Sequence, residues 1–486
     1  MTRPTIKLLT NETIARVLAE ATALLRDPGV RVHSDEALKL LGDAGADIDK
    51  GARVARIPSD MIEKALKTAP SSFHLYNTQG EAVVHYGGDD VHFDPGSSTV
   101  YLLDHGAVEA RTPVTADYVR YIKLAEMLPE LEAVSTALVC SDVPQKMADL
   151  YRLYLTLSYA VKPVVTGAFD IDTLHVMKDL LVAVAGSEQA LAEKPTAVFD
   201  ICPSPPLLWS AITCTNLMDL ARYRIPAQLI SMPLIGATGP ATVIGSVVQH
   251  AAETLSGIVI HQMVSPGAPI VWGGAPTLFD MRTGAPPTGA IETMLFDLSY
   301  VEVGKYLGLP THTYMVVSDA KTVDAQSGFE SGIGAALAIM AGINMVSGPG
   351  LMDFDSTFSL EKMVVDCEII GMARRLERGV AVPEGSLGEE VIRRVGHAGK
   401  FMADKHTKQW FRQEATMPSP VIERHYRETW LAQGAKDAAQ HAHERAEQLI
   451  AAYEPRVPAA TQKTLAAITL RAARAHGVRE LPPVSS

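Results

Sequence analysis

From residue 91 onward, short apolar runs alternate with longer stretches in which apolar residues recur every three or four positions. The apolar runs lie at 91–94, 133–139, 163–168, 196–201, 227–232, 269–272, 311–317 and 343–347. A turn rich in Gly, Pro or Asp follows each run, and the helical stretches lie at 115–127, 144–160, 172–186, 208–223, 241–263, 289–307, 325–341 and 359–378. Eight strands alternating with eight helices predict an α/β fold of the (β/α)8 TIM barrel type. A doubly wound open sheet is the alternative.

The pattern differs on both sides of this repeat. Residues 1–90 predict an α+β cap, with helices at 11–25, 34–44 and 58–68 and strands at 73–77 and 82–86. Residues 91–380 would form the barrel, with a hairpin inserted at 98–111 whose turn is Asp104-His105-Gly106. Residues 381–486 predict a helical extension, with helices at 387–396, 404–414, 427–448 and 459–476. Because this extension is polar, we expect it to wrap the barrel or contact another subunit in a homo-oligomer.

Composition narrows the classes of partner. The net charge is −12, from 43 basic and 55 acidic residues, which argues against a nucleic-acid-binding surface. The four cysteines form no C-x-x-C pair, which suits a reducing, cytoplasmic compartment. Uncharged runs at 225–252, 254–279 and 331–352 are interrupted by Pro and Gly, so they predict buried elements and no membrane span.

Candidate chemistry gathers where the predicted strands end, which is where barrel enzymes place their active sites. Aspartates there would act on the substrate or orient it, and aromatic and polar side chains would bind it. The candidate catalytic residues are Asp94, Asp142 and Asp319, and the candidate substrate-binding residues are Phe169, Trp272, Tyr314, Lys321, Gln326 and Phe354. Each has a structural alternative: the aspartates as turn or helix caps, the aromatic side chains as core, and Lys321 as a solvated charge.

Metal and nucleotide chemistry have little support in the sequence. No predicted strand is followed by G-x-G-x-x-G or by a phosphate-binding loop, and neither H-E-x-x-H nor G-x-S-x-G occurs. Cys140 and Cys202 fall at strand ends and form the alternative of a zinc site. A lone Cys at a buried strand end is usually a small apolar residue, so we expect no tightly bound metal.

Long blocks of the sequence resemble a known family. They are 232–257, 318–350 (SDAKTVDAQSGFESGIGAALAIMAGINMVSGPG), 353–375 and 397–414. The chain is similar to the trimethylamine:corrinoid methyltransferase superfamily, in the branch without pyrrolysine to which glycine betaine methyltransferase belongs. The resemblance implies a TIM barrel and methyl transfer from an amine to Co(I) of a corrinoid (cobalamin) carried by a separate protein.

The residues favour a quaternary amine as the methyl donor. The trimethylamine enzymes of the family carry pyrrolysine, and this chain has only standard residues. A quaternary ammonium is already activated, since its nitrogen is cationic and leaves as a neutral amine, so the site needs no acid and no metal. Aromatic faces attract such a cation by about 0.5–2 kcal/mol each. If the donor is a betaine, Lys321 would meet its carboxylate.

Three other functions remain open from the sequence. The chain could demethylate trimethylamine, or it could be a zinc-assisted thiol or methoxy demethylase that uses Cys140 and Cys202. It could also be a protein that binds quaternary amines without transferring a methyl group.

Overall fold

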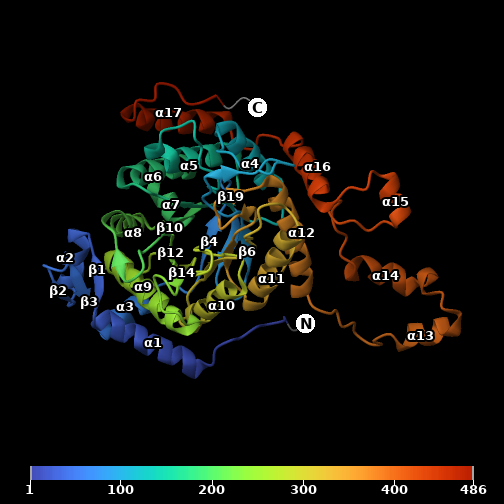
Figure 1. Ribbon diagram of the computed structural model, residues 1–486, viewed down its shortest axis with the longest axis horizontal. Helices are drawn as coiled ribbons and strands as arrows, with labels where there is room; N and C mark the ends of the chain where they lie inside the picture. The colour runs from blue at the N-terminus through green and yellow to red at the C-terminus, as the bar shows by residue number, and fades with distance from the viewer. Residues whose placement is uncertain (1–2, 484–486) are drawn as a thin grey trace.

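Parallel strands occupy the centre of the molecule, and helices surround them (Figure 1). The computed structural model describes residues 3–483. Five strands form one parallel sheet in the order β14-β12-β10-β9-β8, and three form a second in the order β16-β17-β6. Their bounds are β6 His92–Asp94, β8 Val134–Ser135, β9 Val164–Gly167, β10 Ala197–Ile201, β12 Ala227–Ser231, β14 Ile270–Gly274, β16 His312–Tyr314 and β17 Met345–Ser347. All eight predicted strands are present, seven of them with shorter bounds, while β14 extends two residues beyond the predicted end.

Backbone hydrogen bonds also join the outer strands of the two sheets. Trp272 N donates to Pro310 O at 2.9 Å, next to a parallel bridge between Trp272 and Thr311. On the other side, Glu132 N donates to Phe93 O at 3.0 Å. The strands are short because only the central residues of each predicted run pair with a neighbouring strand. Most of their side chains are buried. Burial on both faces explains why their sequences read as continuous apolar runs.

The predicted helices between the strands are present. They are α4 Thr115–Met127, α5 Ala148–Tyr159, α6 Ile171–Ala185, α8 Ala211–Tyr223, α9 Val243–Val264, α10 Ile291–Tyr306, α11 Ala325–Ala341 and α12 Leu360–Glu377. A short helix, α7 (Glu188–Glu193), follows α6. In the part of the chain that the structure describes, α9 alone is long and apolar enough to span a membrane, and 83% of its most apolar window is buried inside the protein. That burial fits a core helix.

The N-terminal region contains three helices and two small sheets. Helices α1 (Asn11–Arg26) and α3 (Ser59–Thr68) pack on α9, and α2 is Asp35–Asp43. Thr10 caps α1, since its side chain accepts from Thr13 N. Strands β4 (Phe73–Tyr76) and β5 (Ala82–Tyr86) lie where strands were predicted, and they pair in antiparallel fashion. The sequence reading missed β1 (Val30–Val32), β2 (Asp47–Asp49) and β3 (Val54–Arg56). They form a sheet in the order β11-β1-β3-β2, in which β1 alone pairs with β11 (Leu208–Trp209).

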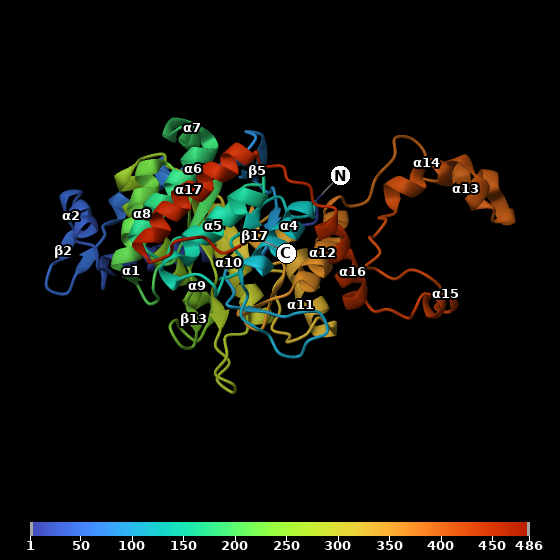
Figure 2. The same cartoon turned by 90° about the horizontal axis from the view of Figure 1, so that it is seen from above.

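The C-terminal region is helical, and its helices are of two kinds. Helices α16 (Ala438–Ala451) and α17 (Ala459–Ala475) pack on the central body, α16 on α12 and α4, and α17 on α5 and α6. Helices α13 (Glu389–Val395), α14 (Lys405–Glu414) and α15 (Arg427–Ala432) lie in an arm that projects away from it (Figure 2). The helix expected at 427–448 is divided at Gly434, whose φ of 98° is left-handed. Subunit contact by this region remains a prediction.

Short strand pairs build up the end of the body to which the carboxyl ends of the parallel strands point. β7 (Tyr101–Leu102) pairs with β19 (Thr357–Phe358), which also pairs with β18 (Leu351–Met352). β13 (Leu234–Ile235) pairs with β15 (Thr277–Leu278). The predicted hairpin at 98–111 is present, with an antiparallel bridge between Leu102 and Arg111.

Candidate active site

A cavity of about 500 Å³ opens at the carboxyl ends of the parallel strands. Its walls include Gly167 at the end of β9, Asp200 in β10, Ile230 in β12 and Tyr314 at the end of β16. Loops that follow β6, β14 and β17 complete it. Small-molecule sites have this form, with mostly apolar walls and a few converging polar groups.

One side of the cavity carries a buried carboxyl and phenol pair. Tyr314 OH donates to Asp200 Oδ2 at 3.3 Å, and Gln228 Nε2 donates to Asp200 Oδ1 at 2.8 Å. Burial raises the pKa of Asp200 to about 7, although both hydrogen bonds favour the ionised form. Burial and the nearby Asp200 also raise the pKa of Tyr314, so its hydroxyl stays protonated. A carboxyl poised near neutrality becomes fully ionised when a cation binds beside it.

A second carboxyl, that of Asp355, reaches the cavity from a tight turn after β18. Asp353, Phe354 and Asp355 have φ of 51°, 56° and 61°, so three consecutive non-glycine residues are left-handed. Each such residue costs about 1–2 kcal/mol, and strain of this kind is concentrated at functional sites. Burial raises the pKa of Asp355 to about 7, against the hydrogen bond that Thr288 Oγ1 donates at 3.2 Å.

Aromatic side chains form the remaining walls. Phe169, Tyr314 and Phe354 all line the cavity, so the structure brings together three of the four aromatic residues that the sequence singled out. Phe169 is 63% exposed, which leaves its ring free to contact a ligand. These faces, with two carboxyls beside them, fit a small organic cation.

One cation also lines the cavity. Arg152 of α5 is 1% exposed, and its Nη1 donates to Thr136 O at 2.8 Å while its Nε donates to Ala148 O at 3.2 Å. Its guanidinium lies 5.6 Å from the centre of the Phe169 ring. The cavity therefore offers a buried positive charge to an anionic group of a ligand.

Asp94 and Asp319 lie behind the cavity walls. Asp94 is fully buried and accepts from Ser347 Oγ at 2.7 Å, while Oδ2 finds no partner among the described residues. Burial and the charge of Asp200 raise its pKa well above the ordinary value. Asp319 accepts from Thr288 N at 2.9 Å and from Gly289 N at 3.2 Å, so it fixes the loop that carries Thr288. Asp319 therefore contacts a wall residue, Thr288, whereas neither aspartate lines the cavity itself.

The structure places four predicted residues away from the cavity. Trp272 is fully buried toward α10, where its Nε1 donates to Tyr300 O at 2.9 Å. Asp142 accepts from Thr115 N at 3.1 Å, at the first turn of α4. The remaining two are Lys321 and Gln326. Lys321 Nζ pairs with Asp353 at 2.8 Å and lies over the Phe354 ring. Gln326 Nε2 donates to Glu330 Oε1 at 2.9 Å. These positions are the structural alternatives that such residues commonly adopt.

Sequence reasoning missed Asp200, Asp355 and Arg152 as cavity residues. Asp200 had a usable signal, because it is the one acidic residue inside an otherwise apolar strand. Asp355 stood in the polar cluster after a predicted strand, and Arg152 was indistinguishable from a solvated charge on a helix. Cys202 lines the cavity, but the described residues contain no candidate metal-ligand group that includes Cys202 or Cys140.

Comparisons with known proteins cover nearly the whole chain. The family model described as Trimethylamine methyltransferase (MTTB) matches residues 1–477. Trimethylamine methyltransferase MttB of Desulfitobacterium hafniense (strain DSM 10664 / DCB-2) is 29% identical over 96% of this chain and 94% of its own. Trimethylamine methyltransferase MttB2 of Methanosarcina mazei is 30% identical over 97% of this chain and 96% of its own.

Two further similarities bear on substrate and fold. Glycine betaine methyltransferase of Desulfitobacterium hafniense (strain Y51) is 28% identical over 93% of this chain and 94% of its own. The crystal structure of the Methanosarcina barkeri monomethylamine methyltransferase (MtmB) superposes with a TM-score of 0.53 at 12% identity, over 91% of this chain and 88% of that one. The latter supports the α/β fold with parallel strands and nothing finer. On the match of the family model and these relatives, the chain belongs to the trimethylamine methyltransferase (MTTB) family and is a methyltransferase.

Proposed function

We propose that this protein transfers a methyl group from a betaine-like quaternary amine to Co(I) of a corrinoid carried by a separate protein. One observation carries the proposal: a single cavity holds aromatic faces, two carboxyls with raised pKa and a buried guanidinium. A betaine has an ammonium group and a carboxylate, and this cavity offers a partner to each. The similarity to a glycine betaine methyltransferase supports the same donor.

We also propose that the eight parallel strands form a closed (β/α)8 barrel. The hydrogen bonds that join β14 to β16 and β6 to β8 support closure, since they link the outer strands of the two sheets. Closure would bring all eight strand ends to one opening. The donor would then lie in the cavity with its methyl group toward the opening.

The residues of this chain would bind and orient the donor. Tyr314 and Phe354 would contact the ammonium, and Asp200 and Asp355 would neutralise it. Arg152 would hold the carboxylate in place of Lys321, whose amino group is already paired with Asp353. Fixing both ends of a small molecule orders its methyl group for in-line displacement.

The corrinoid would approach the donor only from the opening of the cavity. A cavity of about 500 Å³ suits a small amine and is too small to enclose a corrinoid ring. A Co(I) corrinoid supplies a strong nucleophile that accepts the methyl group. The amine leaves neutral, so no group of the protein needs to donate a proton to it.

The direct test is methyl transfer from glycine betaine to free cob(I)alamin, followed by absorbance. Carnitine, choline, proline betaine and trimethylamine complete the substrate panel. We expect turnover with glycine betaine or another betaine and none with trimethylamine. Measurable binding of quaternary amines without turnover of any of them would refute the transfer step.

A pair of variants separates the two cations near the cavity. Arg152→Met is expected to weaken glycine betaine binding and to leave choline binding little changed, because choline has no carboxylate. Lys321→Met removes a charge that lies over the Phe354 ring, so it is expected to change both affinities in the same direction. Because Lys321 is paired with Asp353 outside the cavity, the ratio of glycine betaine to choline affinity is expected to stay unchanged. The opposite result would return the carboxylate to Lys321. Circular dichroism and melting temperature check that the Arg152 variant is folded.

Trimethylamine is the second candidate donor. The family description and most of the similar relatives carry its name. Turnover of trimethylamine alone in the same panel would favour this function.

A further inference from the structure

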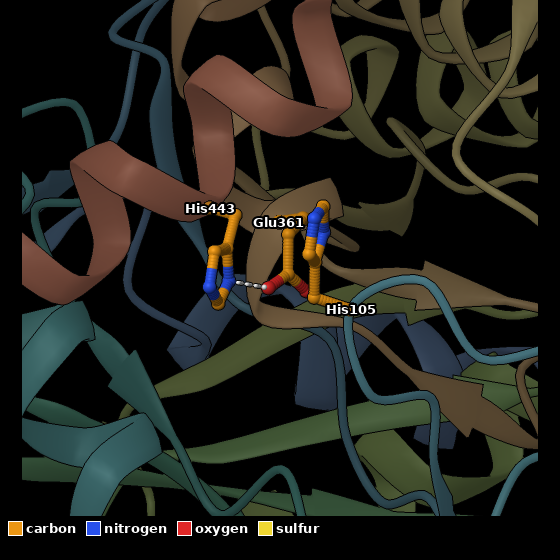
Figure 3. A group of neighbouring side chains, drawn as sticks. All are labelled: His105, Glu361 and His443. Atoms are coloured by element: carbon orange, nitrogen blue, oxygen red, sulfur yellow. Dashed lines mark hydrogen bonds and ion pairs between the residues drawn. The ribbon is translucent and has the colours of Figure 1, made fainter.

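A second group of polar side chains gathers away from the cavity, where three distant parts of the chain meet. His105 comes from the turn of the inserted hairpin, Glu361 from the first turn of α12, and His443 from α16 (Figure 3). The ligating atoms of all three side chains lie within 4.8 Å of one another. None of these residues lines the active-site cavity, so the proposed methyl transfer leaves them unexplained.

The three side chains already face one another. His443 Nδ1 lies 2.8 Å from Glu361 Oε1. The imidazoles of His105 and His443 are stacked, with ring centres 4.1 Å apart and planes 9° from parallel. In Figure 3 the Glu361 carboxylate lies beside the two rings and is joined to His443 by a dashed line. Two imidazoles and one carboxylate form a common set of ligands for a divalent transition metal.

The carboxylate is held firmly in its position. The Glu361 side chain is 8% exposed, against 36% for that of His443. Ser359 Oγ, which caps α12, donates to Glu361 Oε2 at 3.0 Å and leaves Oε1 for the histidines. A hydrogen bond to the second oxygen of a ligand carboxylate is the usual way in which proteins orient it.

The neighbouring acidic residues Asp104 and Asp437 already have other partners, so they do not compete with Glu361 as metal ligands. Asp104, next to His105, is paired with Arg111 at 2.6 Å. Asp437 caps α16 and accepts from Gln440 N at 2.9 Å. A cavity of about 340 Å³, lined by His105 and Glu361 among others, lies beside the group and has room for a water as fourth ligand.

We propose that His105, Glu361 and His443 bind one Zn²⁺ ion, which fastens α16 and the hairpin turn to the first turn of α12. In a tetrahedral site with bonds of about 2.0–2.2 Å, ligand atoms lie about 3.3–3.6 Å apart. The ligand atoms now lie within 4.8 Å of one another and the two imidazole rings are parallel, so the exposed His105 ring must rotate to bring a nitrogen to the ion. The ion joins segments that are 256 and 82 residues apart in sequence, as structural metal sites do.

The experiment measures zinc in the full-length protein. The protein is stripped with a chelator, reloaded with Zn²⁺, dialysed and assayed by elemental analysis. Titration of Zn²⁺ into the stripped protein gives the affinity. We expect about one zinc per chain, and a loss of affinity of at least about tenfold in His443→Ala and Glu361→Gln. His476→Ala, which removes an exposed histidine at the end of α17, is the matched control and is expected to keep wild-type affinity.

Two further readouts guard against loose surface binding and against misfolded variants. Co²⁺ in place of zinc is expected to give the strong visible absorption of a four-coordinate site, and His105→Ala is expected to weaken it. Zn²⁺ is expected to raise the melting temperature of the wild type and of His476→Ala but not of His443→Ala. The proposal is overturned if zinc is substoichiometric after dialysis, or if the three ligand variants bind it as the wild type does.

Discussion

The carboxyl of Asp200 should couple amine binding to pH. Its ordinary pKa is 3.8, and burial raises it to about 7. At 1.36 kcal/mol per pH unit, the difference means that ionising this carboxyl in the empty cavity costs about 4 kcal/mol more than in water. A bound ammonium provides the missing positive charge and offsets part of that cost. The donor should therefore bind preferentially to the ionised form.

The sign and size of the effect follow from this coupling. Below pH 7 the empty site holds a proton that must leave when the cation binds. The Kd for glycine betaine should therefore rise about tenfold for each unit by which the pH falls, for each coupled carboxyl. Above pH 7 the Kd should be flat. Burial also raises the pKa of Asp355 to about 7, so a second proton can be released on binding. Below pH 7, the slope of log Kd against pH in the wild type should therefore have a magnitude between one and two. Asp200→Asn should lower the slope by one and weaken binding above pH 7.

Calorimetric titration from about pH 5.5 to about pH 8.5 measures the slope directly. Repeating each titration in two buffers of different ionisation enthalpy counts the protons released. A pH-independent Kd in the wild type would refute the reasoning. So would an Asp200→Asn variant that keeps the wild-type affinity and slope.

Stability gives an independent measure of the same pKa. Between about pH 4 and pH 7 the folded protein holds a proton on Asp200 that the unfolded chain has released, so stability falls as pH rises through this window. Asp200→Asn cannot ionise and should remove that part of the fall. The variant should therefore unfold at higher urea than the wild type above pH 7, and at similar urea near pH 4.

Three further predictions concern stability. Lys362→Met should lower the free energy of unfolding by about 3–5 kcal/mol, because it leaves the buried carboxylate of Asp366, 2.6 Å from Lys362 Nζ, without its partner. Denaturant unfolding measures this loss, and a Lys362→Met/Asp366→Leu double variant should recover part of it. Gly348→Ala should cost at least about 2 kcal/mol in the same assay, because a Cβ there would collide with Met315 O; unchanged stability would contradict the packing described. Asp142→Asn should cost about 1–2 kcal/mol through the first turn of α4 while leaving kcat unchanged, and a large loss of kcat would instead restore the catalytic role that the sequence suggested.

The order of strands and helices was readable from the sequence because of its periodicity. A strand buried on both faces is a continuous apolar run, and a helix that covers it repeats every three to four residues. Neither signal exists for β1, β2 and β3, because each has only three residues, and β1 pairs with β11 from a distant part of the chain. Local pattern cannot detect pairing of that kind.

The candidate site was less predictable because a buried run does not reveal which of its side chains face inward. Alternate residues of a strand point to opposite sides. In β14 this alternation turns Trp272 toward α10, whereas in β10 it turns Asp200 into the cavity. An acidic residue within an apolar strand is the better signal, since burying a carboxyl without a functional reason is costly.

The proposed zinc ligands were beyond sequence reasoning for a different reason. Metal motifs are recognised by short spacing, and His105, Glu361 and His443 come from a hairpin, a helix after the last parallel strand and a C-terminal helix. Only the fold brings them together. The sequence-based expectation of no tightly bound metal was drawn from motif spacing, from the apolar character of lone cysteines and from the chemistry of the donor. The zinc proposal departs from it on geometry.

Helix α12 connects the two proposed sites. Glu361 and Lys362 are adjacent in its first turn, and side chains one residue apart on a helix point about 100° away from each other. Glu361 turns outward to the histidines, while Lys362 Nζ turns inward to Val316 O at 3.2 Å and to Asp366. Asp366 in turn accepts from Gly350 N at 2.8 Å, at the loop that leads to the Asp353–Asp355 turn. A metal that fixes this turn of α12 would therefore steady the loop that carries Phe354 and Asp355 into the cavity, without contacting the substrate.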